Sequence, residues 1–246
     1  MSCAIALACA ASVAVGDAEL VSAWRDYVAA YIAADGRVID RGDADRSTSE
    51  GQAYAMVRAV WIDDRATFDR VRAWTDANLR EGDDPLPAWL WGKRPDGTWG
   101  TLDRSPASDS DQWMAWALLA AAERWGDATY ATHARALLGA IWDRETRVVA
   151  GSRYLVPGPW AQVGDPVRLN PSYWLPFAWR DFARADPAHG WLDLVDPAYR
   201  GFALCRGSSG LARDWCYLRD SDGALLPAPR GSEAHDDHGF EAYRVP

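Results

Sequence analysis

The feature that most constrains this chain is the helical spacing of its apolar residues. Val21, Trp24 and Val28 fall on one face of a first helix, which ends at Gly36. Short turns and long loops alternate between the helices that follow, and strand patterns are confined to short pieces such as residues 147–150. This organisation predicts an all-α fold of paired helices, an α/α toroid whose long loops collect at one end and form a cleft. The spacing predicts the later helices over residues 50–62, 66–79, 111–125, 128–142, 172–185 and 190–204, with a last helix beginning near 239–241.

The composition excludes several classes of function. The chain has 246 residues and a net charge of -9, which argues against a nucleic-acid partner because phosphate binding needs a basic surface. It also has 15 Trp, more than core packing ordinarily needs, and flat indole faces are suited to stacking on sugar rings. The sequence contains no G-x-S-x-G, G-x-x-x-x-G-K or G-x-G-x-x-G motif, so the serine-hydrolase, nucleotide-binding and Rossmann interpretations have no support.

The N-terminal run, residues 1–16, is apolar and uncharged. It is too short to span a bilayer, which takes about 20 residues. We expect residues 1–18 to be a signal segment, residues 19–246 to form a single domain, and the protein to be periplasmic or secreted. A buried first helix is the alternative. For Cys205 and Cys216, a disulfide and a pair of free buried thiols both remain open.

Two acidic stretches stand at predicted helix starts. In residues 47–54, Ser47 and Glu50 have capping-box spacing, while the functional alternative makes Glu50 a carboxylic acid at the mouth of the cleft. In residues 107–115, Ser108 and Asp111 repeat that spacing, but the additional Asp109 exceeds what one cap needs. A calcium loop is disfavoured because the closing Glu of an EF-hand is missing.

Two further stretches and a histidine pair complete the candidates. Residues 170–174 can be a helix start with core aromatic residues, and in residues 239–244 Glu241 and Arg244 can be an exposed helical pair. His235 and His238 flank two aspartates, but no Cys or third His lies nearby in the sequence. We therefore expect a solvated loop there and neither a metal nor another cofactor.

Taken together and in this order, these stretches resemble glycoside hydrolase family 8, the inverting (α/α)6-barrel enzymes. The longest match is residues 107–125, ASDSDQWMAWALLAAAERW, which departs from the family pattern at Ser110, where Ala or Gly is usual. The resemblance covers about residues 20–246. Within the family, the chain is most similar to the periplasmic endoglucanases of bacterial cellulose synthase systems. The other matching stretches are residues 36–40, 47–54, 86–92, 170–173 and 214–215.

The resemblance implies catalytic roles. Glu50 becomes the general acid, and Asp109 becomes the residue that contacts and distorts the sugar at the cleavage point. Glu241 becomes the general base, where the family has Asp. Inversion needs two carboxyl groups about 6.5–9.5 Å apart, so that a water molecule fits between the base and the sugar. Asp236 and Asp237 remain alternative bases.

Aromatic side chains in or beside the long loops are the expected sugar contacts, with packing at the rim as the alternative. Arg244 is expected to position Glu241 or a sugar hydroxyl. The predicted substrate-binding aromatic residues are Trp91, Trp99, Trp160, Tyr173 and Trp215.

The resemblance also implies partners and a structural consequence. We expect an endo-acting enzyme on β-1,4-glucan, a monomer, with the cellulose synthase machinery as a partner and no membrane span. One alternative is the same fold acting on chitosan, xylan or mixed-linkage glucan. Another is a non-catalytic glucan-binding remnant. Because family members continue beyond the last motif, the expected barrel is incomplete at its C-terminus. Apolar faces should then be exposed, and we expect marginal stability with weak or absent activity.

Overall fold

The computed structural model describes residues 17–207, 210–227, 238–239 and 241–245. The expected signal run over residues 1–16 lies outside these residues, as do Asp236 and Asp237, the alternative bases. No helix in the described ranges is both long and apolar enough to cross a membrane.

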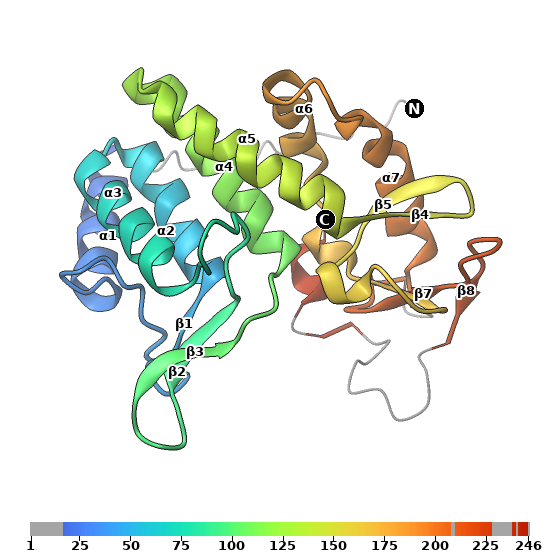
Figure 1. Cartoon of the computed structure of the whole chain (residues 1–246), viewed down its shortest axis with the longest axis horizontal. Coiled ribbons are helices and arrows are strands. Elements are labelled where there is room, and N and C mark those ends of the chain that lie inside the picture. The colour runs from blue at the N-terminus through green and yellow to red at the C-terminus, as the bar shows by residue number, and fades with distance from the viewer. Residues whose placement is uncertain (1–16, 208–209, 228–237, 240, 246) are drawn as a thin grey trace, which may run out of the picture.

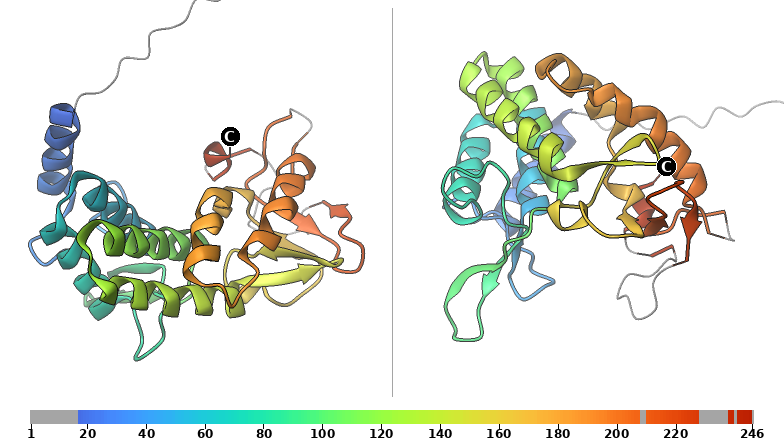
Figure 2. Two further views of the ribbon diagram at one scale, coloured as in Figure 1. Left: turned by 90° about the horizontal axis from the view of Figure 1, so that it is seen from above. Right: turned by 45° about the vertical axis from the view of Figure 1, so that its right-hand side comes forward.

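The described residues form helices in sequential pairs, as the apolar spacing predicts. Helices α1–α3 lie at one end of the molecule, α6 and α7 at the other, and α4 with α5 between them (Figures 1 and 2). The α-helices are α1 Asp17–Tyr31, α2 Ser49–Ile62, α3 Arg65–Asn78, α4 Ser108–Trp125, α5 Ala128–Glu145, α6 Pro176–Ala185 and α7 Val195–Leu204. Single 3-10 turns are η1 Pro159–Ala161, η2 Pro171–Tyr173, η3 Trp191–Leu194 and η4 Ala242–Arg244.

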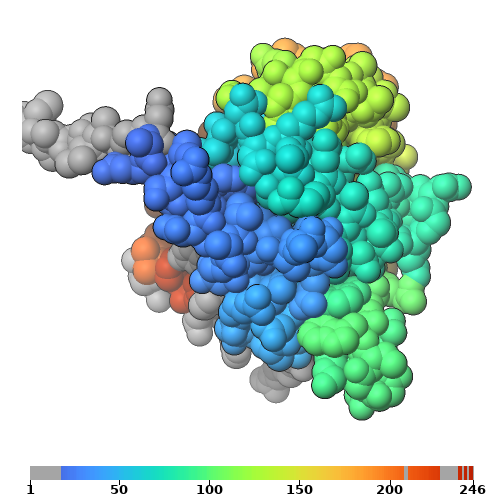
Figure 3. Space-filling model, turned by 90° about the vertical axis from the view of Figure 1, so that its left-hand side faces the viewer, coloured from blue at the N-terminus to red at the C-terminus, as the bar shows by residue number. Residues whose placement is uncertain are grey.

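Among the described residues, three small antiparallel sheets lie in the loops, and the sequence pattern predicted a strand in only one of them. Their strands have two to five residues, too few for alternation to be recognised. The hairpin of β2 and β3 projects from the body (Figures 1 and 3). The sheets are β1 Ser47–Thr48, β2 Leu90–Lys93 and β3 Trp99–Asp103; β4 Thr146–Val149 and β5 Ser152–Leu155; and β6 Val167–Leu169, β7 Cys216–Leu218 and β8 Leu225–Leu226.

The core runs continuously from α1 to β7. Helix α2 packs mainly on α4 and α3, and α4 packs on α5. On α2, Ala55 and Ala59 are fully buried, as are Ala115 and Ala117 on α4. Side chains this small let helix axes approach closely. The packing therefore brings the N-terminal ends of α2 and α4 together beside the loops.

Several predicted boundaries are wrong for local reasons. Helix α6 begins at Pro176, because a residue before proline, here Leu175, is sterically disfavoured in the helical region. Residues 171–173 form only the turn η2, and the helix expected from Gly239 is only η4. Helix α5 continues three residues beyond its predicted end, to Glu145.

Cys205 and Cys216 form a disulfide with a Cα–Cα distance of 5.6 Å. It links the end of α7 to the start of β7, and so decides between the two alternatives that the sequence left open.

Candidate active site

Glu50 lies in the first turn of α2, but it does not cap the helix. Thr48 is the N-cap and accepts a hydrogen bond from the Gly51 N–H at 3.0 Å. The predicted capping box is therefore wrong: Ser47 belongs to β1, and its Oγ accepts from Arg37 Nε at 2.9 Å. Pairing of β1 with β2 shifts the helix start by one residue, which leaves the carboxylate of Glu50 available to the loops.

Asp109 lies in the first turn of α4, and the predicted cap there is also wrong. The N-cap is Ala107, which has no side chain able to cap, and both Ser108 and Asp111 are fully buried inside the helix. The backbone N–H of Ser108 is bonded instead to the carbonyl of Pro157 at 3.0 Å. Asp109 itself is 5 % exposed.

A direct side-chain contact joins the starts of these two helices. The hydroxyls of Ser49 on α2 and Ser110 on α4 are 2.7 Å apart and share a hydrogen bond. Because Glu50 follows Ser49 on α2 and Asp109 precedes Ser110 on α4, this contact brings Glu50 and Asp109 beside each other. Ser110, the departure from the family pattern, thus has a structural use.

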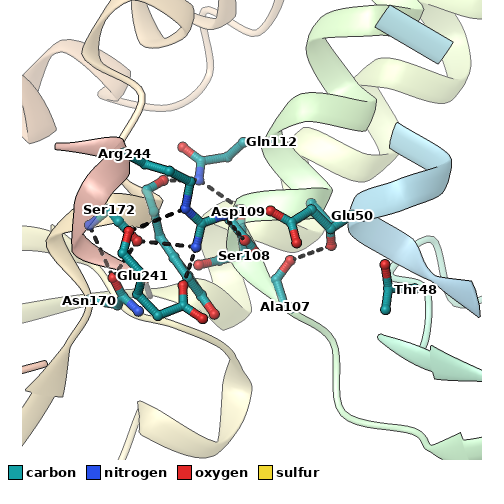
Figure 4. Close-up of polar contacts among 12 residues, drawn as sticks. Thr48, Glu50, Ala107, Ser108, Asp109, Gln112, Asn170, Ser172, Glu241 and Arg244 are labelled. Atoms are coloured by element: carbon teal, nitrogen blue, oxygen red, sulfur yellow. Dashed lines mark hydrogen bonds and ion pairs between the residues drawn. The ribbon is translucent and has the colours of Figure 1, made fainter. Parts of the chain in front are cut away.

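Arg244, in η4, links the three acidic residues (Figure 4). Its Nη1 donates to Glu50 Oε1 at 2.5 Å and to Asp109 Oδ2 at 3.2 Å. Its Nη2 forms an ion pair with Glu241 and donates to Ser172 Oγ at 3.2 Å. Glu50 and Asp109 approach from α2 and α4, whereas Glu241 and Arg244 come from the opposite side (Figure 4). Glu50 and Glu241 therefore bind different nitrogens of one guanidinium.

The turn that carries Glu241 is anchored by Asp214. One oxygen of Asp214 accepts the backbone N–H groups of Gly239, Glu241 and Ala242, at 3.0, 3.1 and 2.7 Å. A Cβ on Gly239 would lie 2.4 Å from Asp214 Oδ2, so glycine permits this approach. Asp214 belongs to a stretch that resembles the family, but its anchoring role is not visible in the sequence.

Gln112 connects α4 to the 170–174 stretch. Its amide nitrogen donates to the carbonyls of Ser108 at 2.7 Å and Tyr173 at 2.9 Å, and its oxygen accepts from Trp179 Nε1 at 2.7 Å. This network places Ser172, within η2, against Arg244. This role of Gln112 could not be predicted from the sequence, because a lone amide carries no distinctive spacing.

Burial and charge set the proton affinities. Burial, reinforced by the charge of Glu50, raises the pKa of Asp109 to about 7, although Arg244 acts in the opposite direction. Burial also raises the pKa of Glu241, again opposed by Arg244. For Arg244, burial disfavours the charge, but the three carboxyls outweigh it and raise the pKa. The site therefore combines a permanent cation with one carboxyl, that of Asp109, whose pKa is about 7, and a second, that of Glu241, whose pKa is raised.

Three aromatic rings lead away from this cluster. The guanidinium of Arg244 lies 5.4 Å from the ring centre of Tyr173, which is followed by Trp215 at 6.3 Å and Trp160 at a further 6.4 Å. Arg168 lies over Trp215 at 3.7 Å. Trp160 is 44 % exposed. The sequence-predicted residues Tyr173, Trp215 and Trp160 thus form one track beside the carboxyls.

Trp91 and Trp99 lie elsewhere, in the β2–β3 hairpin. They stack on each other at 5.1 Å, and Trp74 meets the edge of Trp91 at 5.3 Å. Arg37 lies over both rings, at 4.5 and 4.7 Å. These contacts agree with the packing alternative, while a sugar contact through the exposed part of Trp99 stays a prediction.

A large groove adjoins the cluster. Its volume is about 790 Å³ and Arg244 stands at one edge. Three of its side chains, Trp61, Phe177 and Tyr199, are 59, 46 and 57 % exposed. The expected exposed apolar faces are therefore present. The groove is lined by Tyr54, Val57, Arg58, Trp61, Trp113, Ser172, Trp174, Leu175, Pro176, Phe177, Arg180, Tyr199, Phe202, Ala203, Arg206 and Arg244.

Known proteins match this chain over most of its length. The model of the family "Glycosyl hydrolases family 8" matches residues 1–246. An endoglucanase of Pseudomonas fluorescens is 39 % identical over 204 residues, covering 80 % of this chain and 51 % of that protein. An endoglucanase of Escherichia coli K12 is 38 % identical over 213 residues, covering 85 % and 57 %. The chain thus spans about half the length of the curated relatives it matches.

Solved structures agree with the fold. The family 8 endoglucanase Cel10 from Klebsiella pneumoniae superposes with a TM-score of 0.78 at 34 % identity, covering 85 % of this chain and 67 % of that one. The endo-β-1,4-glucanase CMCax from Acetobacter xylinum also gives 0.78, at 28 % identity, covering 87 % and 67 %. These likenesses confirm the predicted all-α barrel class, and the chain belongs to glycosyl hydrolase family 8.

Proposed function

We propose that this chain hydrolyses β-1,4-glucan internally, with inversion at the anomeric carbon. The observation that carries the proposal is the convergence of Glu50, Asp109 and Glu241 on Arg244, from stretches far apart in the sequence. Glycoside cleavage with inversion needs a carboxylic acid for the leaving oxygen and a carboxylate for water. Several relatives are named endoglucanases, which supports a β-1,4-glucan as the substrate.

Each carboxyl then has one role. Glu50 protonates the departing glycosidic oxygen, and Glu241 takes a proton from the attacking water on the other side of the ring. Asp109, whose pKa is near 7, holds sugar hydroxyls as donor or acceptor and favours a distorted ring. The track of Tyr173, Trp215 and Trp160 stacks the sugars on one side of the cleavage point.

Hydrolysis of carboxymethyl-cellulose tests the proposal, with reducing ends and viscosity followed together. We expect Glu50→Gln and Glu241→Gln to lower kcat by about 10²–10⁴-fold, the usual contribution of a general acid or base. Glu123→Gln, an exposed change on α4, is the matched control and should leave the rate unchanged. The first-formed product should be the α-anomer by NMR. Full activity in Glu50→Gln would falsify the assignment.

Two alternatives have their own outcomes. A relative at 27 % identity is named a reducing-end xylose-releasing exo-oligoxylanase, so xylan is assayed in parallel, with chitosan and mixed-linkage glucan. Glucan binding without hydrolysis in the unchanged chain would favour a binding remnant.

A change to the aromatic track, such as Trp215→Ala, should weaken the binding of long substrates more than that of short ones.

Export, a monomeric state and association with cellulose synthase machinery remain part of this proposal. The disulfide between Cys205 and Cys216 supports an oxidising compartment, because such bonds are rare where thiols are kept reduced. Light scattering on the purified protein tests the monomer. Fractionation of cells that carry the intact gene tests the location, and co-purification with the synthase tests the association.

A further inference from the structure

The second aspartate of the 107–115 stretch has no place in the proposed catalysis. Asp111 lies at the start of α4 and Glu145 is the last residue of α5, and both are 0 % exposed. None of their four carboxyl oxygens accepts a hydrogen bond in the described part of the chain. The two carboxyls lie within hydrogen-bonding reach of each other, and no other donor among the described residues faces them.

The charges around this pair do not offset two ionised groups. The charge of Arg144 acts on both carboxyls, but its Nη1 already binds both oxygens of Asp84 at 2.7 and 2.9 Å. The carboxyl groups of Asp109 and Asp84 add further negative charge. Two ionised carboxylates in this setting face a large desolvation cost in addition to their mutual repulsion. A single proton between them turns the same contact into a charge-assisted hydrogen bond.

We propose that Asp111 and Glu145 share one proton, and that this buried pair holds the start of α4, and with it Asp109, against the end of α5. The two residues act as positioning residues. They touch neither the aromatic track nor the guanidinium of Arg244 in the described contacts.

The backbone at the same junction supports the positioning role. The segment after β5 binds both helix ends: the N–H of Val156 donates to the carbonyl of Glu145 at 2.8 Å, and the carbonyl of Pro157 accepts from Ser108 at 3.0 Å. Asp109 is the next residue along α4. A change in the Asp111–Glu145 contact therefore acts on a junction one residue from the cleft.

Proton affinities agree with the geometry. Burial raises the pKa of Asp111 and of Glu145 well above their ordinary values, and each carboxyl also responds to the charge or hydrogen bond of the other. A carboxyl whose pKa is raised on folding stabilises the protein fully below its unfolded pKa, about 4. That stabilisation is lost as the pH rises toward the folded pKa. Alkaline conditions should therefore weaken the α4–α5 junction.

The decisive variant is Glu145→Gln, whose amide donates to Asp111 without needing a proton. We expect its melting temperature to fall less with pH than that of the unchanged protein, by roughly 2–4 °C for each pH unit between about 5 and 8. Because both proteins contain Asp109 and Glu241, the titration of these two residues contributes to both melting curves and cancels in the difference between them. The exposed variants Glu123→Gln and Asp143→Asn are controls and should follow the parent curve.

Equal pH slopes for the parent and Glu145→Gln would overturn the proposal. If Glu145→Gln does not fold, infrared spectroscopy of Asp109→Asn at about pH 8 replaces it. A protonated carboxyl band that persists there supports the shared proton, and its absence contradicts it.

A catalytic readout separates positioning from mere stability. This part rests on the proposed function, whereas the melting curves do not. In Glu145→Gln, the alkaline limb of kcat/KM should move to higher pH while the acidic limb stays, because the junction no longer loses its proton. An unchanged profile with altered melting curves limits the pair to a stabilising role, and inactivity of the parent counts only against hydrolysis.

Discussion

Arg244 is the residue on which the acidic groups of the site depend. It binds Glu50, Asp109 and Glu241 at once and acts against the rise in pKa of both Asp109 and Glu241. A planar guanidinium can bind several oxygens in one plane, which the point charge of a lysine cannot do. At the scale of single residues, this is the contact that makes three separated motifs one site.

Replacing Arg244 tests this dependence. In Arg244→Met, the pKa of Glu241 should rise, so the base becomes protonated at higher pH and activity is lost first on the acidic side. We expect the acidic limb of kcat/KM to move up by about one pH unit or more. Arg244→Lys should restore part of that shift, and Arg184→Met, on the exposed face of α6, should have none. An acidic limb that stays in place in Arg244→Met would show that the guanidinium does not act on the base.

Residue identities were more predictable than their contacts. The residue pattern marked Glu50 and Asp109 as carboxyls at helix starts, whereas the catalytic roles of Glu50, Asp109 and Glu241 followed from the resemblance to the family. The caps could not be predicted, since the β1–β2 pairing that moves the cap to Thr48 joins residues far apart in the chain. Neither could the anchor at Asp214, because Gly239 and its partner approach only in the fold.

At the scale of elements, the disulfide fixes the loop that presents Trp215. Cys205 ends α7 and Cys216 begins β7, directly after Trp215, and both sulfurs are buried. Closing a loop of 11 residues restricts the unfolded chain. The bridge therefore holds both the aromatic track and the Asp214 anchor.

Removing the bridge should weaken the fold measurably. We expect Cys205→Ser with Cys216→Ser to lower the free energy of unfolding by about 3 kcal/mol, from the loop-closure entropy. Urea denaturation measures the loss, and reducing agent should cause the same loss in the unchanged protein but none in the double variant. A denaturation midpoint that does not respond to reduction would contradict this.

Helices were the elements that the sequence located well, because each has enough residues for the apolar period to repeat. Helix α2 begins one residue before its predicted start, and α3 is displaced by one residue. Helices α6 and α7 are present but begin later than predicted, α6 because Pro176 sets its start, and only the helix expected near Gly239 is reduced to the turn η4. Apart from β4, the strands were missed because pairing, not alternation, defines segments as short as β1.

At the scale of the whole molecule, the groove beside Arg244 is a large exposed apolar area of the surface. Its lining is mainly aromatic and aliphatic, and it joins α2 and α4 to α6 and α7. Apolar patches of this kind mark places where other molecules bind. The paired helices were predictable from local periodicity, whereas the depth of this groove depends on how distant pairs face each other.

Dye binding tests that surface in the folded state. We expect an apolar fluorescent probe such as ANS to bind the native chain, and Trp61→Ser with Phe177→Ser to reduce the signal by roughly half or more, because two exposed rings are lost. Val163→Ser removes an exposed side chain outside the groove lining and is the control. A signal that falls equally in both variants would place the dye elsewhere.

The distance along the chain between Glu50 and Arg244, 194 positions, has a consequence for how the molecule assembles. Helices α2 and α4 can pack as soon as both are made, and their packing already crowds two acidic groups together. Until η4 docks, that crowding has no counter-ion from Arg244, so docking of Arg244 should relieve the repulsion between the two acidic groups. Long-range contacts of this sort form late in folding. We therefore expect the cleft to be completed late in folding.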